Sequence, residues 1–182
     1  AYERICNQEN SADFSELLLR TVELLEVNDE VRNLQHRRFK EILVDEFQDT
    51  NSIQYRFLKL MTAPTSHIMV VGDDDQSIYG WRGADYKIIL GFQKDFMNSK
   101  VIKLEQNYRS TAHILNAANS VIENNDERLD KVLYSNKGEG EKLSYYIADD
   151  EADEANYIVG NIRRTAGGNY NKFAILYRTN NQ

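Results

Sequence analysis

Residues 42–46 read Ile-Leu-Val-Asp-Glu, and residues 68–75 read Ile-Met-Val-Val-Gly-Asp-Asp-Asp. Each stretch is a short apolar run that ends abruptly at carboxylates. Runs of this length without polar alternation are typical of strands buried in a parallel sheet. Because ligands bind beyond the carboxyl ends of parallel strands, we expect these acids to face a site.

Apolar residues at helical spacing surround the two strands. Between Phe14 and Leu25 they form one stripe of a helix, and Asp13 with Glu16 three residues on resembles a capping box. Two more stripes predict helices over 114–122 and 155–162, and the polar stretch 124–140 reads as a loop. Further strands are expected at 101–104, 143–147 and 173–177. This alternation predicts an α/β fold with a parallel sheet.

Composition narrows the function classes. The 182 residues are 41% hydrophobic and 28% charged, which is ordinary globular usage. The net charge of −7 argues against a protein that binds nucleic acid through a broad basic face. The single Cys6 excludes an intramolecular disulfide and a multi-cysteine zinc site, so we expect a reducing, cytoplasmic setting. No run reaches the roughly 18 apolar residues of a membrane helix.

Asp45 and Glu46 have the form of a nucleotide-hydrolase acidic motif. One carboxylate of such a pair holds Mg²⁺ near the β- and γ-phosphates, and the other orients and deprotonates the attacking water. Taken alone the pattern is weak, because many strands end in acids for solubility.

Three longer strings sharpen the interpretation. They are Asp45-Glu46-Phe47-Gln48-Asp49-Thr50-Asn51, then Gly72 to Ala84 (GDDDQSIYGWRGA), then Leu104 to Thr111 (LEQNYRST). In this order and spacing they closely resemble superfamily 1 DNA helicases of the UvrD/Rep/PcrA type. The resemblance runs over nearly the whole chain, from Asp13-Phe14 to the stretch Leu176 to Asn180. It implies a RecA-like parallel sheet flanked by helices, of the P-loop NTPase type.

The resemblance also implies a function and its ligands. The parent would be an ATP-dependent 3′-to-5′ DNA helicase or translocase acting in DNA repair or replication. ATP and Mg²⁺ would be its cofactors, and single-stranded DNA and duplex junctions its partners. Asp45 corresponds to the Mg²⁺-associated carboxylate, Glu46 to the general base and Gln76 to the γ-phosphate sensor. Tyr108 corresponds to the aromatic residue that stacks on adenine, and Arg109 to an arginine finger.

Tyr79, Trp81 and Arg82 resemble the residues that meet single-stranded DNA. An aromatic face stacks on any base, which suits stepping that ignores sequence. Trp81 could instead belong to the core, and the Tyr79 ring could pack beneath its loop. Similarly, Arg109 could pair with Glu105 at a helix start.

Other charged groups have ordinary interpretations. Asp73, Asp74 and Asp75 do not predict a metal cluster, because consecutive loop residues rarely converge. The basic stretch 32–40 reads as a solvated helix end, with contact to a DNA backbone as the alternative. Arg178 could approach the nucleotide or end its strand.

The departures from the pattern limit what this chain does. Gly-x-x-x-x-Gly-Lys-Ser/Thr is missing from the sequence, and with it the loop and lysine that cradle the phosphates. We therefore expect an internal fragment. Residues 1–105 would be the C-terminal part of the first RecA-like motor domain, and residues 106–182 the N-terminal part of the second. By itself this fragment is expected to be inactive.

Competing functions stay open at this point. A related motor of a recombination helicase–nuclease shares these motifs. From a different class, the acids could form a metal-dependent nuclease site, or the chain could be a non-catalytic DNA-binding module.

Overall fold

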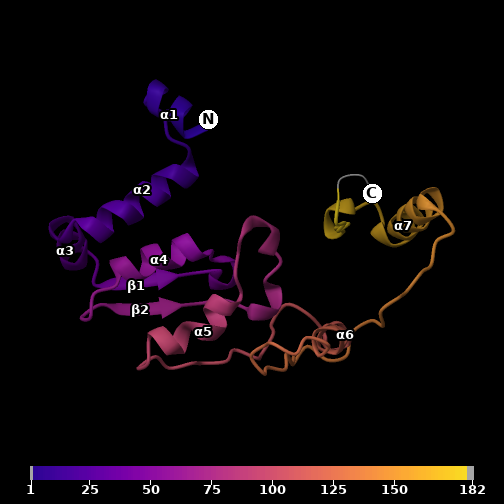
Figure 1. Ribbon diagram of the computed structural model, residues 1–182. Coiled ribbons are helices and arrows are strands. Elements are labelled where there is room, and N and C mark those ends of the chain that lie inside the picture. Colours follow the sequence, from indigo (N-terminus) through magenta and orange to yellow (C-terminus); the bar gives the residue numbers. More distant parts are fainter. Residues whose placement is uncertain (1, 180–182) are drawn as a thin grey trace.

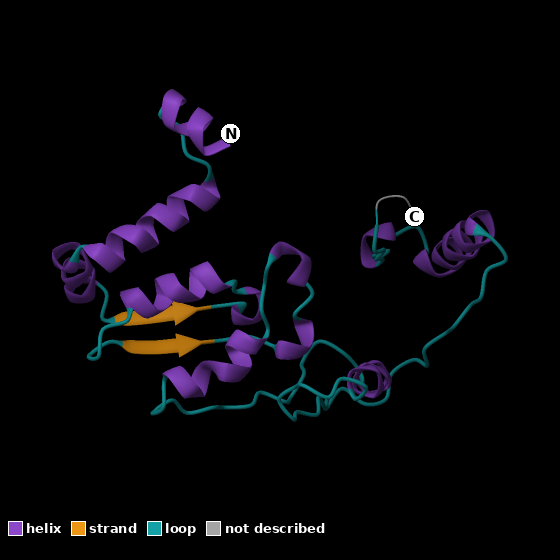
Figure 2. Ribbon diagram, viewed as in Figure 1, coloured by secondary structure: helices purple, strands orange, loops and turns teal. Residues whose placement is uncertain are grey.

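The computed structural model describes residues 2–179, and Figures 1 and 2 show the order of its elements. The helices and strands are α1 (Tyr2–Glu9), α2 (Phe14–Val27), α3 (Asp29–Arg38), β1 (Glu41–Val44), α4 (Ser52–Met61), β2 (His67–Val70), α5 (Lys87–Asp95), α6 (Ala112–Ile122) and α7 (Glu151–Ala166). Short 3₁₀ turns are η1 (Phe47–Asp49), η2 (Asp74–Gln76), η3 (Gly80–Arg82) and η4 (Tyr170–Lys172). None of the helices in the described range is long and apolar enough to span a bilayer.

The two strands predicted at 42–44 and 68–71 form a parallel pair. Ile42 lies opposite Ile68 and Val44 opposite Val70. The pairing extends past the strand ends, where the Val71 N–H donates to the Val44 carbonyl over 2.8 Å. This confirms the predicted α/β arrangement and brings the acids after both strands to one edge of the sheet.

The strands are buried on one face, which corrects the expectation of burial throughout. Ile42, Val44, Ile68 and Val70 pack against a core of Phe47, Leu58 from α4 and Phe92 from α5. The rings of Phe47 and Phe92 meet edge to face at 5.5 Å between centroids. On the other face Leu43 is 78% exposed and Met69 58% exposed. A strand with one buried face is recognised from its sequence when polar residues alternate with apolar ones. Here the exposed positions are apolar too, so the sequence does not show which face is buried.

The predicted helical stripes correspond to α2, α6 and α7. Asp13 caps α2 by accepting from the Glu16 N–H at 2.7 Å, but the Glu16 carboxylate pairs with Arg20. The complete capping box is on α4, where Asn51 and Gln54 bond reciprocally at 2.9 Å. Packing of α2 against α4 then completes the helical layer.

The three other expected strands do not form within the described chain. At these positions Ile102, Ile147 and Leu176 are 69%, 76% and 94% exposed. A strand exists only when a neighbour pairs with its backbone, and these apolar stretches find none among residues 2–179. The segment before α7 instead runs as an extended connection (Figure 1). Asn180, the last residue of the predicted resemblance, lies outside the described residues.

The loop predicted over 124–140 folds back onto the stretch before α6. Tyr134 and Glu105 bond through their backbones at 3.1 Å, and the Asn107 N–H donates to the Tyr134 carbonyl at 2.7 Å. The Asn119 side chain on α6 bonds both backbone groups of Leu133. These hydrogen bonds fix the stretch before α6 against the 124–140 loop.

Candidate functional site

An open cleft of about 730 Å³ lies at the carboxyl ends of β1 and β2. That volume is within the range of small-molecule sites. Three separate stretches of sequence line it: Asp45, Glu46, Val71, Gly72, Asp73, Gln76, Gln106, Asn107, Tyr108 and Arg109. All five side chains that the resemblance assigned to ATP chemistry, namely Asp45, Glu46, Gln76, Tyr108 and Arg109, are in this set.

The two carboxylates follow β1 directly. Glu46 has φ 48° and ψ 43°, a left-handed conformation that is uncommon outside glycine. The turn is held by the Phe47 N–H, which donates to the Val71 carbonyl at 3.0 Å. An Asp45 carboxylate oxygen accepts from the Glu46 N–H at 2.9 Å. Both side chains are exposed to the cleft, and the sharp turn points them away from the core.

Gln48 is a site residue that sequence reasoning missed. It is only 2% exposed. Its Nε2 donates to Glu46 Oε2 at 2.7 Å, and its Oε1 accepts from the Asp73 N–H at 3.0 Å. The side chain thus joins the loop after β1 to the loop after β2. A buried amide inside an acidic motif has no local signature, since its partners come from another part of the chain.

Gln76 is on η2, in the loop after β2. Its Nε2 donates to Asp73 Oδ2 at 2.7 Å, and the Asp73 side chain also accepts from the Asp75 N–H at 3.1 Å. The Gln76 side chain is exposed at the cleft. An exposed amide with one fixed hydrogen bond retains further capacity to meet a ligand.

Tyr108 and Arg109 line the cleft from the stretch before α6. Asn107 Oδ1 accepts from the backbone N–H groups of Arg109 and Ser110, at 2.9 and 2.8 Å, and fixes the turn. The Tyr108 ring is 73% exposed, and its hydroxyl donates to Gln106. Glu105, the alternative partner for Arg109, instead accepts from the Val132 N–H at 2.9 Å.

Tyr79, Trp81 and Arg82 form a second group outside the cleft lining. They lie on or next to η3, in the loop that stands out between β2 and α5 (Figure 1). The Arg82 guanidinium lies 4.7 Å from the Trp81 ring centre and 5.3 Å from that of Tyr79. Trp81 is 76% exposed, so it does not belong to the core, while Tyr79 is 38% exposed.

The three consecutive aspartates do converge, which corrects the expectation that they would not. One oxygen from each of Asp73, Asp74 and Asp75 lies within 4.8 Å of the others. Their common partner is the ammonium of Lys131. In the basic stretch, Arg32 donates to the Leu25 carbonyl and His36 Nε2 lies 2.7 Å from the Leu60 carbonyl, so these two side chains serve the fold.

Comparison with known families agrees with this geometry. Residues 1–97 match the UvrD/REP helicase N-terminal domain, and residues 102–182 match the UvrD-like helicase C-terminal domain. The chain belongs to the UvrD-like helicase family. The predicted membership and the α/β helicase fold are therefore confirmed.

Individual members of the UvrD-like family are similar along the whole chain. It is 49% identical to DNA helicase II of Escherichia coli strain K12 and covers 26% of that protein. It is 48% identical to the ATP-dependent DNA helicase PcrA of Staphylococcus aureus strain NCTC 8325, and 45% identical to PcrA of Leuconostoc citreum. The chain spans about a quarter of the length of these relatives. Nothing in these relatives' names supports the nuclease alternatives.

Proposed function

We propose that the chain forms part of the ATP-hydrolysing cleft, and the adjoining DNA-contact loop, of an ATP-dependent 3′-to-5′ DNA helicase in DNA repair or replication. One observation carries the proposal: a single cleft gathers Asp45, Glu46, Gln76, Tyr108 and Arg109 from three distant stretches. We assign residues 1–105 to the first RecA-like motor domain and residues 106–182 to the second. ATP would then bind between the two.

The carboxylates suit magnesium-dependent hydrolysis. Asp45 offers an exposed carboxylate at the strand end, and oxygen ligands of this kind are what Mg²⁺ prefers. When bound, Mg²⁺ would neutralise charge on the β- and γ-phosphates. Glu46 would accept the proton of the attacking water, with Gln48 fixing one of its carboxylate oxygens.

The remaining cleft residues suit the nucleotide itself. The exposed Tyr108 ring can stack on adenine, and Arg109 beside it can reach the γ-phosphate and stabilise charge as the bond to it breaks. Gln76, on the other wall, can donate to the same phosphate. The loop that holds Gln76 continues directly into η3, so a shift of Gln76 can be transmitted to Trp81 and Arg82.

The η3 loop suits single strands of DNA. Trp81 presents an exposed ring, and the neighbouring Arg82 adds a cation that can meet a phosphate. This explains how a chain with a net charge of −7 can hold DNA without a broad basic face. We propose single-stranded DNA and duplex junctions as its partners, and the cytoplasm as its location.

Replacing the general base tests the proposal. Glu46→Gln in the full-length form keeps the shape and the bond to Gln48 but cannot take a proton. Nucleotide should bind normally while DNA-stimulated ATP turnover falls by about 10²- to 10⁴-fold. Glu41→Gln, an exposed acid on β1 outside the cleft, is the matched control and should turn over normally. Near-normal turnover by Glu46→Gln would remove Glu46 from the chemistry.

A further inference from the structure

Lys131 and Arg128 bind the three aspartates of the loop after β2 from a distant segment. The Lys131 ammonium lies 2.6 Å from Asp73, 2.5 Å from Asp74 and 3.0 Å from Asp75. The two loops come from the stretches that match the N-terminal and the C-terminal family models respectively. The contact therefore joins the two parts that border the cleft.

Arg128 and the backbone complete this contact. The Arg128 guanidinium meets both oxygens of Asp75, at 2.9 and 2.8 Å, in the bidentate geometry that is strongest for this pair. The Leu129 N–H donates to the second oxygen of Asp74 at 2.7 Å. Arg128 also donates to the Lys131 carbonyl at 3.0 Å, so the segment 128–131 is itself held in shape.

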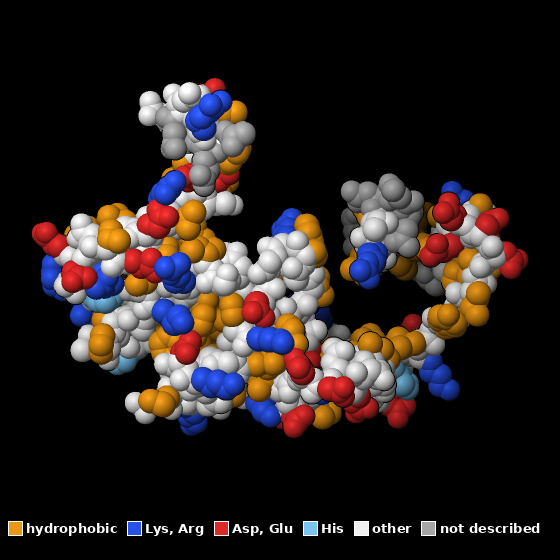
Figure 3. All heavy atoms as spheres, viewed as in Figure 1, with side chains coloured by type: hydrophobic (Ala, Val, Ile, Leu, Met, Phe, Trp, Pro, Cys, Tyr) orange, Lys and Arg blue, Asp and Glu red, His pale blue; other side chains and the backbone are white. Residues whose placement is uncertain are grey.

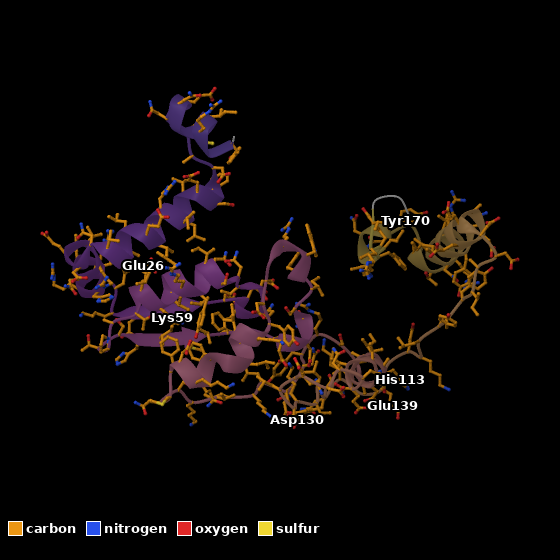
Figure 4. The ribbon with its side chains drawn as sticks, viewed as in Figure 1. Glu26, Lys59, His113, Asp130, Glu139 and Tyr170 are labelled. Carbon is orange, nitrogen blue, oxygen red and sulfur yellow. The ribbon has the colours of Figure 1, made fainter. Side chains whose placement is uncertain are left out.

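Burial sets this cluster apart from ordinary surface ion pairs. Side-chain exposure is 3% for Asp74, 12% for Arg128, 13% for Asp75 and 14% for Lys131. At such depth an unpaired carboxylate is costly, so removal of a cation is felt strongly. Figure 3 shows acidic and basic side chains interspersed over the visible face, and Figure 4 shows Asp130, of the same segment, among the loops between α5 and α6.

The cluster leads directly to the cleft through Asp73. One oxygen of Asp73 accepts from Lys131, while the other accepts from Gln76 Nε2 at 2.7 Å. The Asp73 N–H donates to Gln48, which holds Glu46. Two hydrogen bonds, one from Lys131 to Asp73 and one from Gln76 to Asp73, thus link the Lys131 ammonium to the Gln76 amide.

A metal ion is the other group that three carboxylates could share. The Lys131 ammonium already stands among the three oxygens at hydrogen-bonding distance, where a cation would have to sit. The geometry therefore favours a link between segments over a metal site.

We propose that Lys131, assisted by Arg128, is a positioning residue. It fixes Asp73 and thereby makes the orientation of Gln76 depend on the position of the segment 128–131. The proposal rests on the proposed function, because Gln76 must act on the nucleotide for its orientation to matter. Lys131 itself does not line the cleft. Its loss should lower kcat and leave the KM for ATP nearly unchanged, since Tyr108, Arg109 and Asp45 keep their places.

The test uses the full-length form and its DNA-stimulated ATP turnover. Lys131→Ala should reduce kcat by about 10- to 100-fold, the scale of a misplaced catalytic group, with KM within about threefold. Lys131→Arg keeps the cation and should recover much of the loss. Lys103→Ala is the matched control: Lys103 donates to the Asp130 carbonyl in the same loop but does not touch the aspartates, so it should behave as wild type.

A double-variant comparison separates positioning from mere stability. If Lys131 acts through Gln76, adding Lys131→Ala to Gln76→Ala should cost nothing further, whereas independent effects would add. Additive losses, or a normal kcat in Lys131→Ala, would overturn the proposal. Should Lys131→Ala lower the melting temperature below the assay range, Asp73→Asn breaks the same charge link at constant shape and takes its place in the comparison.

Failure of this inference is distinguishable from failure of the proposed function. If Glu46→Gln abolishes ATP turnover while Lys131→Ala does not reduce it, the proposed function of the cleft is supported and the positioning role of Lys131 is wrong. If Glu46→Gln turns over normally, the assignment of the cleft itself is wrong.

Discussion

At the scale of single residues, the site depends on the backbone turn at Glu46 and on the buried Gln48 side chain. Glu46 takes a left-handed backbone conformation, and Gln48 bridges it to Asp73 from inside the core. Gly72 makes room for this bridge, because a Cβ there would lie 2.6 Å from Gln48 Oε1 and 3.1 Å from the Phe47 nitrogen. A side chain at position 72 would therefore displace the buried Gln48 amide from its hydrogen bonds to Glu46 and Asp73 and press on the Phe47 main chain.

The first prediction compares two glycines. Gly72→Ala should destabilise the chain by about 1–3 kcal/mol, the usual cost of overpacking. Gly91→Ala in α5 meets nothing within 4 Å and should stabilise by about 0.5–1 kcal/mol, because alanine favours helices. Urea unfolding of both variants measures the difference. If Gly72→Ala were as stable as Gly91→Ala, the loops after β1 and β2 would not approach each other as closely as described.

At the scale of elements, the loop between β2 and α5 has two parts in sequence, one at the cleft and one outside its lining. Its first turn, η2, is held by Lys131 and Arg128, and its second, η3, presents Trp81 and Arg82. Gly83, at φ 87°, ends η3 in a left-handed conformation. A base held by hydrogen bonds and an exposed tip within one loop suit the proposed coupling between nucleotide and DNA.

The exposed tip gives a prediction about DNA binding. Trp81→Ala in the full-length form should weaken single-stranded DNA binding by roughly 5- to 150-fold, from stacking worth about 1–3 kcal/mol per base. The loss should be similar for different base sequences, and the melting temperature should not change, because the ring is 76% exposed. Oligonucleotide titration measures it, with the exposed Tyr170→Ala as the control (Figure 4).

Salt dependence separates the ring from its neighbouring cation. Arg82→Ala should reduce the slope of log K against log salt by about one ion, while Trp81→Ala should leave it nearly unchanged. If Trp81→Ala bound single-stranded DNA with normal affinity but had a lower melting temperature, the Trp81 ring would contribute to stability and not to DNA binding.

The base of the loop gives a prediction about pH. Burial would raise the pKa of Asp75, but its bonds to Arg128 and Lys131 outweigh burial and hold the pKa below the usual 3.8. Burial would lower the pKa of Lys131, but its bonds to Asp73, Asp74 and Asp75 raise it above the usual 10.5. The Asp75 contribution to stability is thus present above pH 3.8 and lost as the pH falls through the lower folded-state pKa. The Lys131 contribution is present below pH 10.5 and lost at higher pH.

Urea midpoints measured across pH test this window. The difference between wild type and Asp75→Asn should be constant from about pH 5 to 9 and shrink below about pH 4. A difference that instead changed near pH 6.5, where histidine titrates, would mean that another group controls the contact.

At the scale of the whole molecule, the chain holds both walls of a cleft but not its phosphate-binding loop. The acids and Gln76 line the cleft from the loops after β1 and β2, and Tyr108 and Arg109 line it from the stretch before α6. The sequence contains no Gly-x-x-x-x-Gly-Lys-Ser/Thr, the motif that supplies the main positive charge for a triphosphate in this chemistry.

The chain by itself should therefore not hydrolyse ATP at a useful rate. Preorganised charge around the transferring phosphoryl group is the largest catalytic contribution, and its chief donors are missing from these 182 residues. Phosphate release by the purified chain with single-stranded DNA measures this, with its Glu46→Gln variant as the blank. Turnover clearly above that blank would contradict the expectation.

Much of this protein is determined locally, and the sequence alone predicts those parts. The two parallel strands, the helices α2, α6 and α7, and the acids at the strand ends follow from periodicity and from where the apolar runs stop. The motif strings were enough to predict the family. The extent of each strand and helix depends on neighbours within a few residues along the chain, whereas the pairing of β1 with β2 joins distant stretches.

Only the tertiary structure decided the rest, because it depends on partners far away in sequence. The apolar stretches at 101–104, 143–147 and 173–177 have strand-forming composition but stay unpaired in the described chain, since pairing requires a second strand at the right place. The buried Gln48 side chain meets the Asp73 backbone, and the three aspartates converge around Lys131 while Arg128 pairs with Asp75. Mutual repulsion would otherwise hold such carboxylates apart, and no local pattern shows where the compensating charge comes from.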